Sequence, residues 1–305
     1  MPYTKASVFI CLDIKNIKTF IRVSELNSFT NAAKELNYVQ STVTSQIQQL
    51  ESELGFPLFD RIGKSVSLTS MGKEFLIRAY EIVHIIEDVQ SLGKKDDEIS
   101  GVLRVGVLES LLLNKVTNIL TKFKDTYKNI TLIIKMGESD ELIHMLKRNE
   151  LDIIYLSTEN DTEEDIKCCY KNEEEIIFVS SIDHPLAKKE EIMLQELFNY
   201  SFVLTEKNGI CHKRLLKTVA ENDLTLNYSI EVDSTAAVAL AVEKGLGIAF
   251  LPKYSVEHLI KEKKLKHLNV QIEKQTYFSR VLRHKGRWFS PVMQNFISLI
   301  KEFEK

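Results

Sequence analysis

The segment that most constrains the fold of this chain is "NAAKELNYVQSTVTSQIQQLESELG", which covers residues 31–55. Read as a helix, its second half places four apolar residues at spacings of four, three and four: Val43, Ile47, Leu50 and Leu54. This spacing predicts one buried stripe along the helix. The opposite side carries short, uncharged hydrogen-bonding side chains, where a solvated helix usually carries Lys and Glu. The helix therefore offers a polar surface without charge.

A shorter helix is predicted just before this one, and Ser28 or Thr30 can cap it. Its paired alanines at 32–33 allow another helix to approach closely, and a tight turn follows at 37–38. A further amphipathic helix is predicted upstream, over 14–26. Two helices joined by a few residues, the second with an apolar stripe, are typical of a helix-turn-helix.

The period of the sequence changes after this motif. Val66 and Leu68 alternate with polar residues, which predicts a short strand pair with its turn at 63–64. From Ser70 to about residue 92 the helical period returns, with more apolar positions than one small domain can cover. We therefore expect this long helix to pair with the same helix of a second copy of the chain.

The uncharged face of the helix after the turn suits the major groove of DNA, which calls for short side chains that donate and accept hydrogen bonds. Basic residues at the tip of the strand pair would touch the flanking backbone or minor groove. The candidate DNA-binding residues are Thr30, Gln40, Ser41, Thr44, Ser45, Gln48, Arg61 and Lys64. The pattern alone also fits a Ser/Thr/Gln-rich helix in an ordinary bundle, because such helix pairs are common.

A charged break, "GKKDDEIS" at 93–100, is the best candidate for a linker. Beyond it, predicted strands alternate with predicted helices, beginning with the strand "VLRVGVL", a helix over 111–127, and the strands "ITLIIKMG" and "LDIIYLS". A second run of strands and helices follows, and an amphipathic helix over 291–303 closes the chain. This rhythm predicts a parallel sheet with helices on its faces.

Residues 28–72, "SFTNAAKELNYVQSTVTSQIQQLESELGFPLFDRIGKSVSLTSMG", closely resemble the signature of LysR-type transcriptional regulators. That family reads S-F-T-x-A-A-x-x-L, Q-x-x-V-S-x-Q-I-x-x-L-E-x-x-L-G, L-F-x-R and L-T-x-x-G. The match covers most of residues 14–72, and a weaker resemblance continues through "GVLES", "MGESDEL", "ELDIIY" and "VEKGLGIAFLP". One departure is Ser45, which stands where many members carry Arg, so a contact made by that Arg would be absent here.

The resemblance implies an all-α N-terminal winged helix-turn-helix with a long linker helix. An α/β effector domain of two subdomains, similar to a periplasmic binding protein, would follow. We expect a disordered leader at 1–13, a DNA-binding domain at 14–72, a dimerising helix and hinge at 73–100, and an effector-binding domain at 101–305, with subdomain I at 101–172 and 270–305 and subdomain II at 173–269. The leader also raises the hypothesis of a native start at Leu12, because nothing before it pairs with a later element.

In open α/β sheets, ligands bind beyond the carboxyl ends of the strands, where helix N-termini present free N–H groups. The candidate effector-binding residues at such positions are Ser110, Leu111, Ser139, Ser157, Thr205, Asn208, Cys211, Ser234 and Thr235. Hydroxyls at helix starts suit a carboxylate or another small anion, although Glu109 and Glu138 would repel an anion if they faced inward. Ser and Thr are also good helix caps, which accounts for about half of these positions without any ligand.

Cys211 adjoins His212, Lys213 and Arg214, an environment that can lower the pKa of a thiol. Some LysR-type regulators sense peroxide through cysteines in this region. Sensing by a disulfide needs a second thiol, and none lies nearby in the sequence. A cysteine in the wall of the pocket is therefore favoured over a redox sensor.

No metal-ligand spacing, cofactor motif or catalytic motif is found, so neither a cofactor nor enzymatic activity is expected. The resemblance implies that the effector is a small-molecule co-inducer. The resemblance implies these partners: double-stranded operator DNA with an inverted repeat, a second copy in a dimer or tetramer, and RNA polymerase. A bacterial cytoplasmic location without a membrane segment is expected. The net charge of −3 requires the basic surface to be local, or doubled by dimerisation.

The leading interpretation is a sequence-specific DNA-binding transcriptional regulator controlled by a small molecule. An alternative is a solute-binding or enzymatic α/β protein whose N-terminal helices serve only for dimerisation. A third possibility is a constitutive DNA-binding protein with a vestigial cleft.

Overall fold

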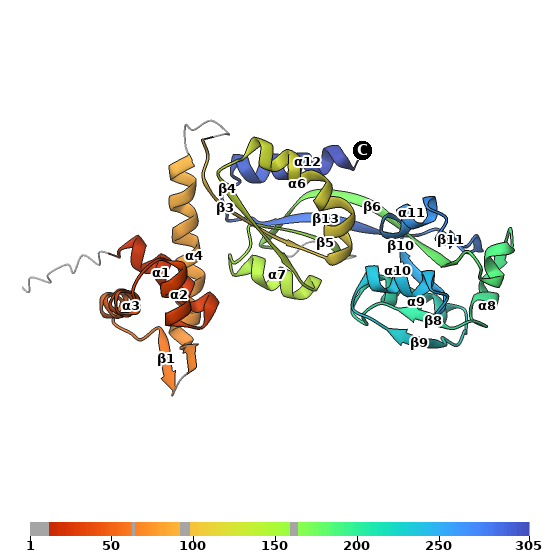
Figure 1. Ribbon diagram of the computed structural model, residues 1–305, viewed down its shortest axis with the longest axis horizontal. Coiled ribbons are helices and arrows are strands. Elements are labelled where there is room, and N and C mark those ends of the chain that lie inside the picture. The colour runs from red at the N-terminus through yellow and green to blue at the C-terminus, as the bar shows by residue number, and fades with distance from the viewer. Residues whose placement is uncertain (1–11, 63–64, 92–97, 159–163, 305) are drawn as a thin grey trace, which may run out of the picture. The chain divides into compact units, whose positions relative to one another are not determined.

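The computed structural model describes residues 12–62, 65–91, 98–158 and 164–304 of the 305-residue chain. The chain forms two compact units, an N-terminal one that ends with the long helix α4 and a C-terminal one that begins with strand β3 (Figure 1). In the described part of the chain, no helix has both the length and the apolar composition needed to cross a membrane.

The N-terminal unit is a winged helix-turn-helix. Its elements are α1 (Ile14–Leu26), α2 (Phe29–Glu35), α3 (Gln40–Leu54), β1 (Phe59–Ile62), β2 (Ser65–Leu68) and α4 (Ser70–Ser91). Ser28 caps α2, since its hydroxyl accepts a hydrogen bond from the Asn31 N–H over 3.2 Å. Asp13 caps α1 by accepting from the Lys15 N–H. Asp13 therefore belongs to this unit and not to a leader, while residues 1–11 lie outside the described residues.

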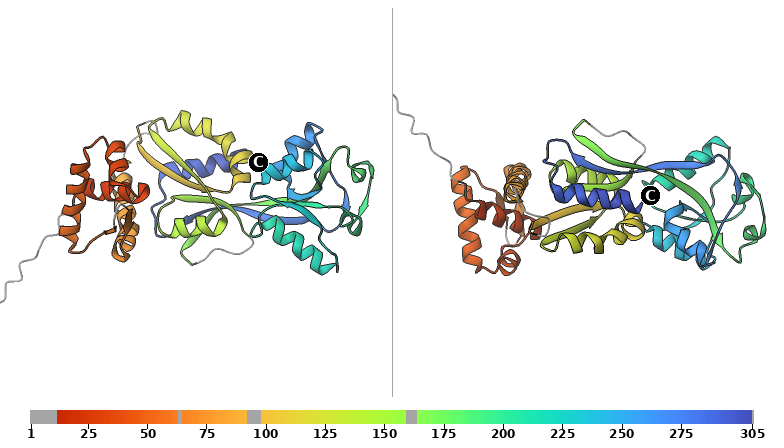
Figure 2. Two further views of the ribbon diagram at one scale, coloured as in Figure 1. Left: turned by 60° about the horizontal axis from the view of Figure 1, so that its bottom comes forward. Right: turned by 90° about the horizontal axis from the view of Figure 1, so that it is seen from above.

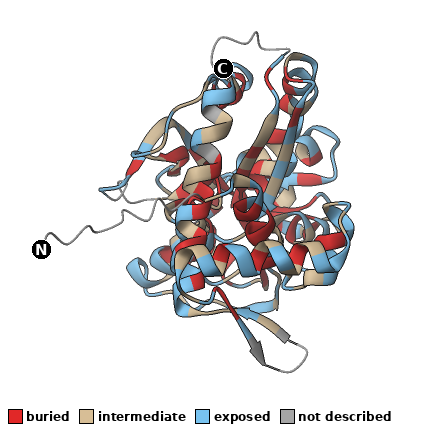
Figure 3. Cartoon of the chain, turned by 90° about the vertical axis from the view of Figure 1, so that its left-hand side faces the viewer, coloured by how far each residue is buried: buried red, intermediate tan, exposed pale blue. Residues whose placement is uncertain are grey.

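One core holds the three short helices, the wing and the start of α4 together, and the exposed positions lie on the outside of the helices (Figure 3). Val43, Ile47 and Leu50 of α3 are fully buried, whereas Leu54 is only partly buried. The Phe20 ring lies at the centre of the core, 5.4 Å from the Phe59 ring and 5.2 Å from the Phe75 ring, measured between centroids. The predicted stripe is thus the surface by which α3 packs on its neighbours.

Hydrogen bonds explain the residues at the start and end of the wing. The Glu51 carboxylate accepts from the backbone N–H groups of Leu58 and Phe59, and so fixes the chain that enters β1. The Thr69 hydroxyl accepts from the Gly72 N–H over 2.8 Å and caps α4. A Cβ atom at Gly72 would lie 2.1 Å from the Leu58 carbonyl oxygen, so only glycine fits there.

The C-terminal unit contains an α/β sheet with helices on both faces. Its strands are β3 (Gly101–Val107), β4 (Ile130–Met136), β5 (Ile153–Thr158), β6 (Ile166–Ser181), β7 (Ile192–Met193), β8 (Phe202–Leu204), β9 (Tyr228–Glu231), β10 (Ala249–Pro252), β11 (Leu265–His267), β12 (Val270–Gln271) and β13 (Gln275–His284). Its helices are α5 (Glu109–Leu111), a π-helical turn (Leu112–Val116), α6 (Thr117–Thr126), α7 (Ser139–Lys147), a 3-10 turn (Pro185–Lys188), α8 (Leu194–Leu197), α9 (Ile210–Glu221), α10 (Thr235–Glu243), α11 (Lys253–Lys261) and α12 (Pro291–Phe303).

A first lobe is formed by β3, β4 and β5 with α5, α6, α7 and α12. Strand β3 lies between β4 and β5 and pairs with both in parallel, as the alternation of strands and helices predicts. Helices α6 and α12 cover one face of these strands and α7 covers the other (Figure 1). Phe123 of α6 and Phe296 of α12 meet edge to face, with ring centroids 5.2 Å apart. The carboxyl ends of the three strands therefore open at one edge of the lobe.

A second lobe is formed by β8 to β11 with α8 to α11, and two long strands, β6 and β13, run through both lobes (Figure 2). On β13, Val281 belongs to the core of the first lobe and Tyr277 to a core of the second. On β6, Ile166 belongs to a core of the first lobe and Ile176 to a core of the second. The lobes are therefore joined by continuous strands, an arrangement that suits hinge motion. The predicted subdomain boundary at 172–173 falls inside β6, so it stays a prediction.

Two features of this unit differ from the expectation. The helix predicted from 111 to 127 is interrupted by the π-helical turn, and the Lys115 side chain projects from that turn. Helix α11 was not predicted, and Tyr254 lies in its first turn. Tyr254 contacts Ser110, which lines the cavity described below, and Lys115 lies over the Tyr254 ring.

Candidate functional site

The N-terminal unit exposes the face of α3 that the sequence assigns to DNA. Gln40, Ser41, Ser45 and Gln48 are exposed, and Thr44 is half-buried. The Thr44 hydroxyl donates to the Gln40 carbonyl oxygen, over 3.0 Å, one turn back in the same helix. This bond orients the hydroxyl and leaves its oxygen able to accept from a base or another donor.

Thr30 joins this face from the neighbouring helix. It lies exposed on α2, and its hydroxyl donates to the Gln40 side-chain oxygen over 3.2 Å. A Gln side chain held through its oxygen turns its NH2 group outward, where it can meet a base edge or a phosphate. The two helices of the motif therefore present one continuous polar surface.

The wing residues are only partly placed. Arg61 lies in β1, opposite Val66 of β2, and its side chain is outside the described part of the structure. Lys64 also lies outside the described residues. Contacts of both with DNA stay a prediction.

Val39 is a residue of this surface that the sequence analysis missed. It occupies the N-cap of α3, makes no side-chain capping hydrogen bond, and is 67% exposed. An apolar residue at a cap leaves backbone N–H groups of the first turn without their usual side-chain acceptor. The signal in the sequence was an isolated valine directly before the uncharged polar run.

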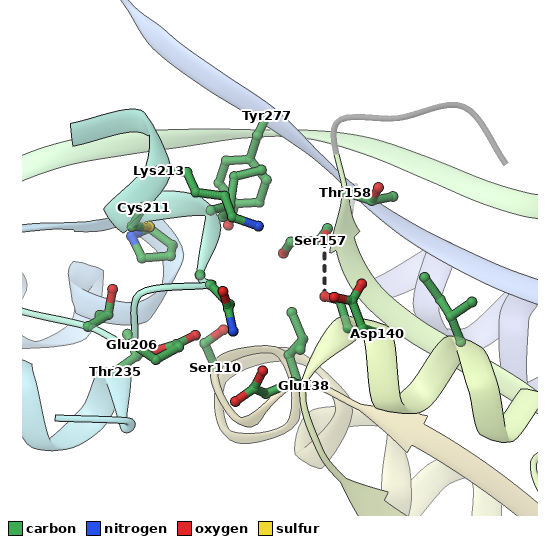
Figure 4. Close-up of a pocket in the computed structure, with 18 residues that line it drawn as sticks. Ser110, Glu138, Asp140, Ser157, Thr158, Glu206, Cys211, Lys213, Thr235 and Tyr277 are labelled. Carbon is green, nitrogen blue, oxygen red and sulfur yellow. Dashed lines mark hydrogen bonds between the residues drawn. The ribbon is translucent and has the colours of Figure 1, made fainter. Parts of the chain in front are cut away.

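The C-terminal unit contains a cavity of about 200 Å³ between its two lobes (Figure 4). Seven predicted effector residues line it: Ser110, Ser139, Ser157, Thr205, Asn208, Cys211 and Thr235. The other lining residues are Leu108, Glu138, Asp140, Ile143, Thr158, Glu206, Gly209, Ile210, Lys213, Pro252 and Tyr277. Residues from both lobes thus share one cavity.

The topology of the sheets explains why these hydroxyls meet. Ser110 follows β3, Ser139 begins α7 after β4, and Ser157 lies in β5. In the second lobe, Thr205 follows β8 and Thr235 begins α10 after β9. Strands β3, β4 and β5 are parallel, as are β8 and β9, so the carboxyl ends within each set lie together.

Two predicted effector residues do not line the cavity. Leu111 is fully buried in the core of the first lobe, because the short helix α5 turns it away from the cavity side that Ser110 faces. Ser234 is the N-cap of α10, where its hydroxyl accepts from the Ala237 N–H and donates to the Glu109 carboxylate over 2.8 Å. The structure thus places both residues outside the lining of the cavity, and their part in effector binding stays a prediction.

A chain of hydroxyls leads from the cavity into the protein. The Ser110 Oγ atom lies 3.0 Å from the Tyr254 hydroxyl oxygen, and the Tyr277 hydroxyl donates to the same oxygen over 3.4 Å. Burial raises the pKa of Tyr254 above its ordinary range, so the phenol stays protonated. Behind it, the Lys115 ammonium lies 4.7 Å from the centroid of the Tyr254 ring.

Acidic side chains of the cavity were largely missed. Glu138, Asp140 and Glu206 line it, and of these three the sequence indicated only Glu138, as a charge that would repel an anion if it faced inward. Burial raises the pKa of Glu206, and the charges of Glu138, Asp233 and Glu109 raise it further. The position of Glu206, two residues after the end of β8, was the available signal.

The Cys211 thiol is buried, with 5% of the residue exposed. Burial raises its pKa well above the ordinary range, and the nearby Glu206 charge raises it further. The pKa lowering that the sequence suggested is therefore wrong. A protonated thiol is a poor nucleophile, so Cys211 is suited to the cavity wall. Over the described residues, no group of three or more His, Cys, Asp or Glu is arranged to hold a metal ion.

A winged helix-turn-helix followed by a two-lobed α/β unit, with a cavity at the carboxyl ends of its strands, defines the class of ligand-responsive DNA-binding regulators. The profile described as "Bacterial regulatory helix-turn-helix protein, lysR family" matches residues 14–73, and that described as "LysR substrate binding domain" matches residues 96–305. The chain belongs to the LysR family of DNA-binding transcriptional regulators, and its C-terminal unit is the family's effector-binding domain.

Relatives and solved structures agree with this assignment. The regulator YwqM of Bacillus subtilis is 32% identical over 292 residues, which cover 95% of this chain and 99% of YwqM. A full-length OxyR variant from Pseudomonas aeruginosa has a similar fold, with a TM-score of 0.74 at 18% identity over 96% of this chain and 94% of that one. CbnR in complex with its target DNA gives a TM-score of 0.65 at 18% identity, over 95% and 99%.

Proposed function

We propose that two copies of this chain place their α3 helices in successive major grooves of an operator with an inverted repeat, and that a small molecule in the cavity between the lobes controls the geometry of the pair. The exposed, uncharged face of α3 carries this proposal. Gln40, Ser41, Thr44 and Ser45 offer amide and hydroxyl groups and no net charge, which suits recognition of base edges.

Helix α4 supports the dimeric arrangement. One side of it buries Phe75, Ala79 and Val83 in the core of its own unit. Ile85 and Val89, further along, are 62% and 60% exposed. Apolar residues at this spacing form a seam on which the same helix of a second copy can pack. The proposal has three further parts. The protein forms a tetramer, it contacts RNA polymerase, and it is located in the cytoplasm, where the operator DNA is.

We also propose that the ligand controls the regulator by binding in the cavity and is not chemically changed there. The Ser110 hydroxyl is engaged with Tyr254, and the Cys211 thiol is held protonated. Among the described residues that line the cavity there is no His to act as a base. These features suit a cavity that binds and releases its ligand unchanged.

The test is a selection of random-sequence duplex DNA on the full-length protein, followed by sequencing of the retained DNA. The expected result is an enriched inverted repeat. A Gln40→Ala, Thr44→Ala double variant should lose the enrichment, because it removes groups that would contact bases and phosphates. A Gln195→Ala, Thr225→Ala double variant is the matched control, since both residues are exposed in the C-terminal unit. Absence of enrichment at low salt, where non-specific electrostatic binding is strongest, would contradict the proposal.

A further inference from the structure

The electrostatic character of the cavity points to the chemical class of its ligand. Three carboxylates line it, Glu138 and Asp140 from the first lobe and Glu206 from the second. Lys213 is the one cationic side chain among the described lining residues. The described lining therefore carries a formal charge of −2 when these groups are ionised, which opposes the small anion that the hydroxyls alone suggested.

Further negative charge lies close by. Glu109 and Asp233 are near enough to Glu206 for their charges to raise its pKa, together with Glu138. The Glu109 carboxylate accepts from Ser234 through Oε1, and its Oε2 atom is buried without a hydrogen-bond partner in the described structure. These carboxylates raise the electrostatic cost of bringing an anionic ligand into the cavity, and they favour a cationic one.

Two of the three carboxylates lie on a different side of the cavity from the lysine, and Asp140 lies apart from both. Figure 4 shows Glu138 and Glu206 along one side and Lys213 across from them, with its amino group directed into the space between the lobes. Five apolar residues also line the cavity: Leu108, Ile143, Ile210, Pro252 and Tyr277. A ligand that fits has a short aliphatic body and carries its positive charge toward the carboxylate side.

We infer that the effector of this regulator is a small organic cation, namely an aliphatic compound with one or more protonated amino groups and a net positive charge. This inference rests on the proposal that the cavity is the effector site. Its ammonium would be held by Glu138 and Glu206 and by the hydroxyls of Ser110 and Thr235. An ammonium donates up to three hydrogen bonds, and these carboxylate and hydroxyl oxygens can all accept. A divalent metal is a poorer fit, because the described residues offer no group of three suitable ligands.

The test is isothermal titration of the full-length protein with three probes: 1,4-diaminobutane, L-lysine and glutarate. Both amines are expected to bind and glutarate is not. Comparison of the affinities of the two amines shows whether Lys213 binds a carboxylate of the ligand, since only L-lysine carries one. Binding of glutarate alone, or failure of both amines to bind at up to about 10 mM, would overturn the inference.

Variants separate a specific site from general attraction to an acidic protein. Glu138→Gln and Glu206→Gln keep the shape of each side chain and remove its charge, and each should weaken binding of the amines at least about tenfold. Glu191→Gln is the matched control, because Glu191 is exposed and outside the cavity. Equal weakening by all three variants would overturn the inference. The DNA selection needs no ligand, so its outcome distinguishes failure of the proposed function from failure of this inference.

Discussion

The Lys115 ammonium lies 2.9 Å from the Glu304 carboxylate, a contact between the π-helical turn and the residue that caps the C-terminus of α12. The same ammonium pairs with Glu174 of β6. The side chains of Glu174 and Glu304 are only 7% and 4% exposed, and that of Lys115 is 14% exposed. One buried cation therefore neutralises two buried carboxylates. It lies over the ring of Tyr254, whose hydroxyl contacts Ser110 of the cavity.

Removal of that cation should destabilise the C-terminal unit strongly. Lys115→Met keeps most of the side-chain volume but leaves Glu174 and Glu304 buried without a counter-charge, at a cost of about 3–5 kcal/mol. Lys122→Met is the control, because its ion pair with Glu302 is exposed and contributes less than about 1 kcal/mol. Thermal unfolding of both variants checks this, and similar melting temperatures for the two would contradict the role given to Lys115.

Gly72→Ala should destabilise the N-terminal unit. The new methyl group would lie 2.1 Å from the Leu58 carbonyl oxygen, and overpacking against backbone costs about 1–3 kcal/mol. Calorimetry of the full-length variant should show a lower melting temperature for this unit. Lys73→Ala, at an exposed position of the same helix, should change it little. If the two substitutions lowered the melting temperature equally, the result would contradict the close approach of α4 to the segment that enters the wing.

Val39→Thr should stabilise the same unit. The hydroxyl would supply the missing acceptor at the N-terminus of α3, which is worth about 0.5–2 kcal/mol. Val39→Ala provides no acceptor and serves as the control. A melting temperature that rises for the Thr variant and not for the Ala variant is expected. Equal melting temperatures of the two variants would mean that the backbone N–H groups in the first turn of α3 already have other hydrogen-bond acceptors.

The stability of the C-terminal unit should respond to pH through Glu206. Because its pKa is raised in the folded state, folding favours the protonated carboxyl. The stability that this group contributes is fully present below the ordinary pKa near 4.5, and it is lost as the pH rises through the higher folded pKa. Glu206→Gln should therefore be more stable than the wild type at neutral pH by up to about 1 kcal/mol, since solvent screens this partly exposed group. The difference should vanish below the ordinary pKa.

Denaturation of the wild type and of Glu206→Gln across this pH range checks the prediction. Glu191→Gln is the control and should track the wild type at every pH. A Glu206→Gln variant that is less stable than the wild type at neutral pH would contradict the repulsion among the acidic groups of the cavity.

The N-terminal unit was predictable because its signals are local. The apolar stripe at Val43, Ile47 and Leu50 and the cap at Ser28 fixed the two helices of the motif, and the structure confirms both. The long helix predicted from Ser70 also agrees with α4. Helical periods and caps are set by residues within a few positions of each other, so a single sequence carries them.

The cavity was predictable in part. Hydroxyls such as Ser139 and Thr205 follow strands, and a parallel sheet brings strand ends together whatever the details of packing. Leu111 and Glu206 show the limit, because the rotation of a short helix or loop decides which neighbour faces the cavity. Tyr277 lies on β13, far along the chain, and joins the cavity only because β13 runs through both lobes.

The affinity of the full-length protein for the selected inverted repeat, compared with a shuffled duplex of the same length, tests the central claim most directly. Fluorescence anisotropy at about 0.15 M salt measures both. A regulator that reads bases through α3 should prefer the selected site by about 10³-fold or more, and Gln40→Ala should reduce that preference at least about fivefold. Equal affinity for the two duplexes, or a Gln40→Ala variant that retains the full preference, would contradict the assignment of α3 as the reading helix.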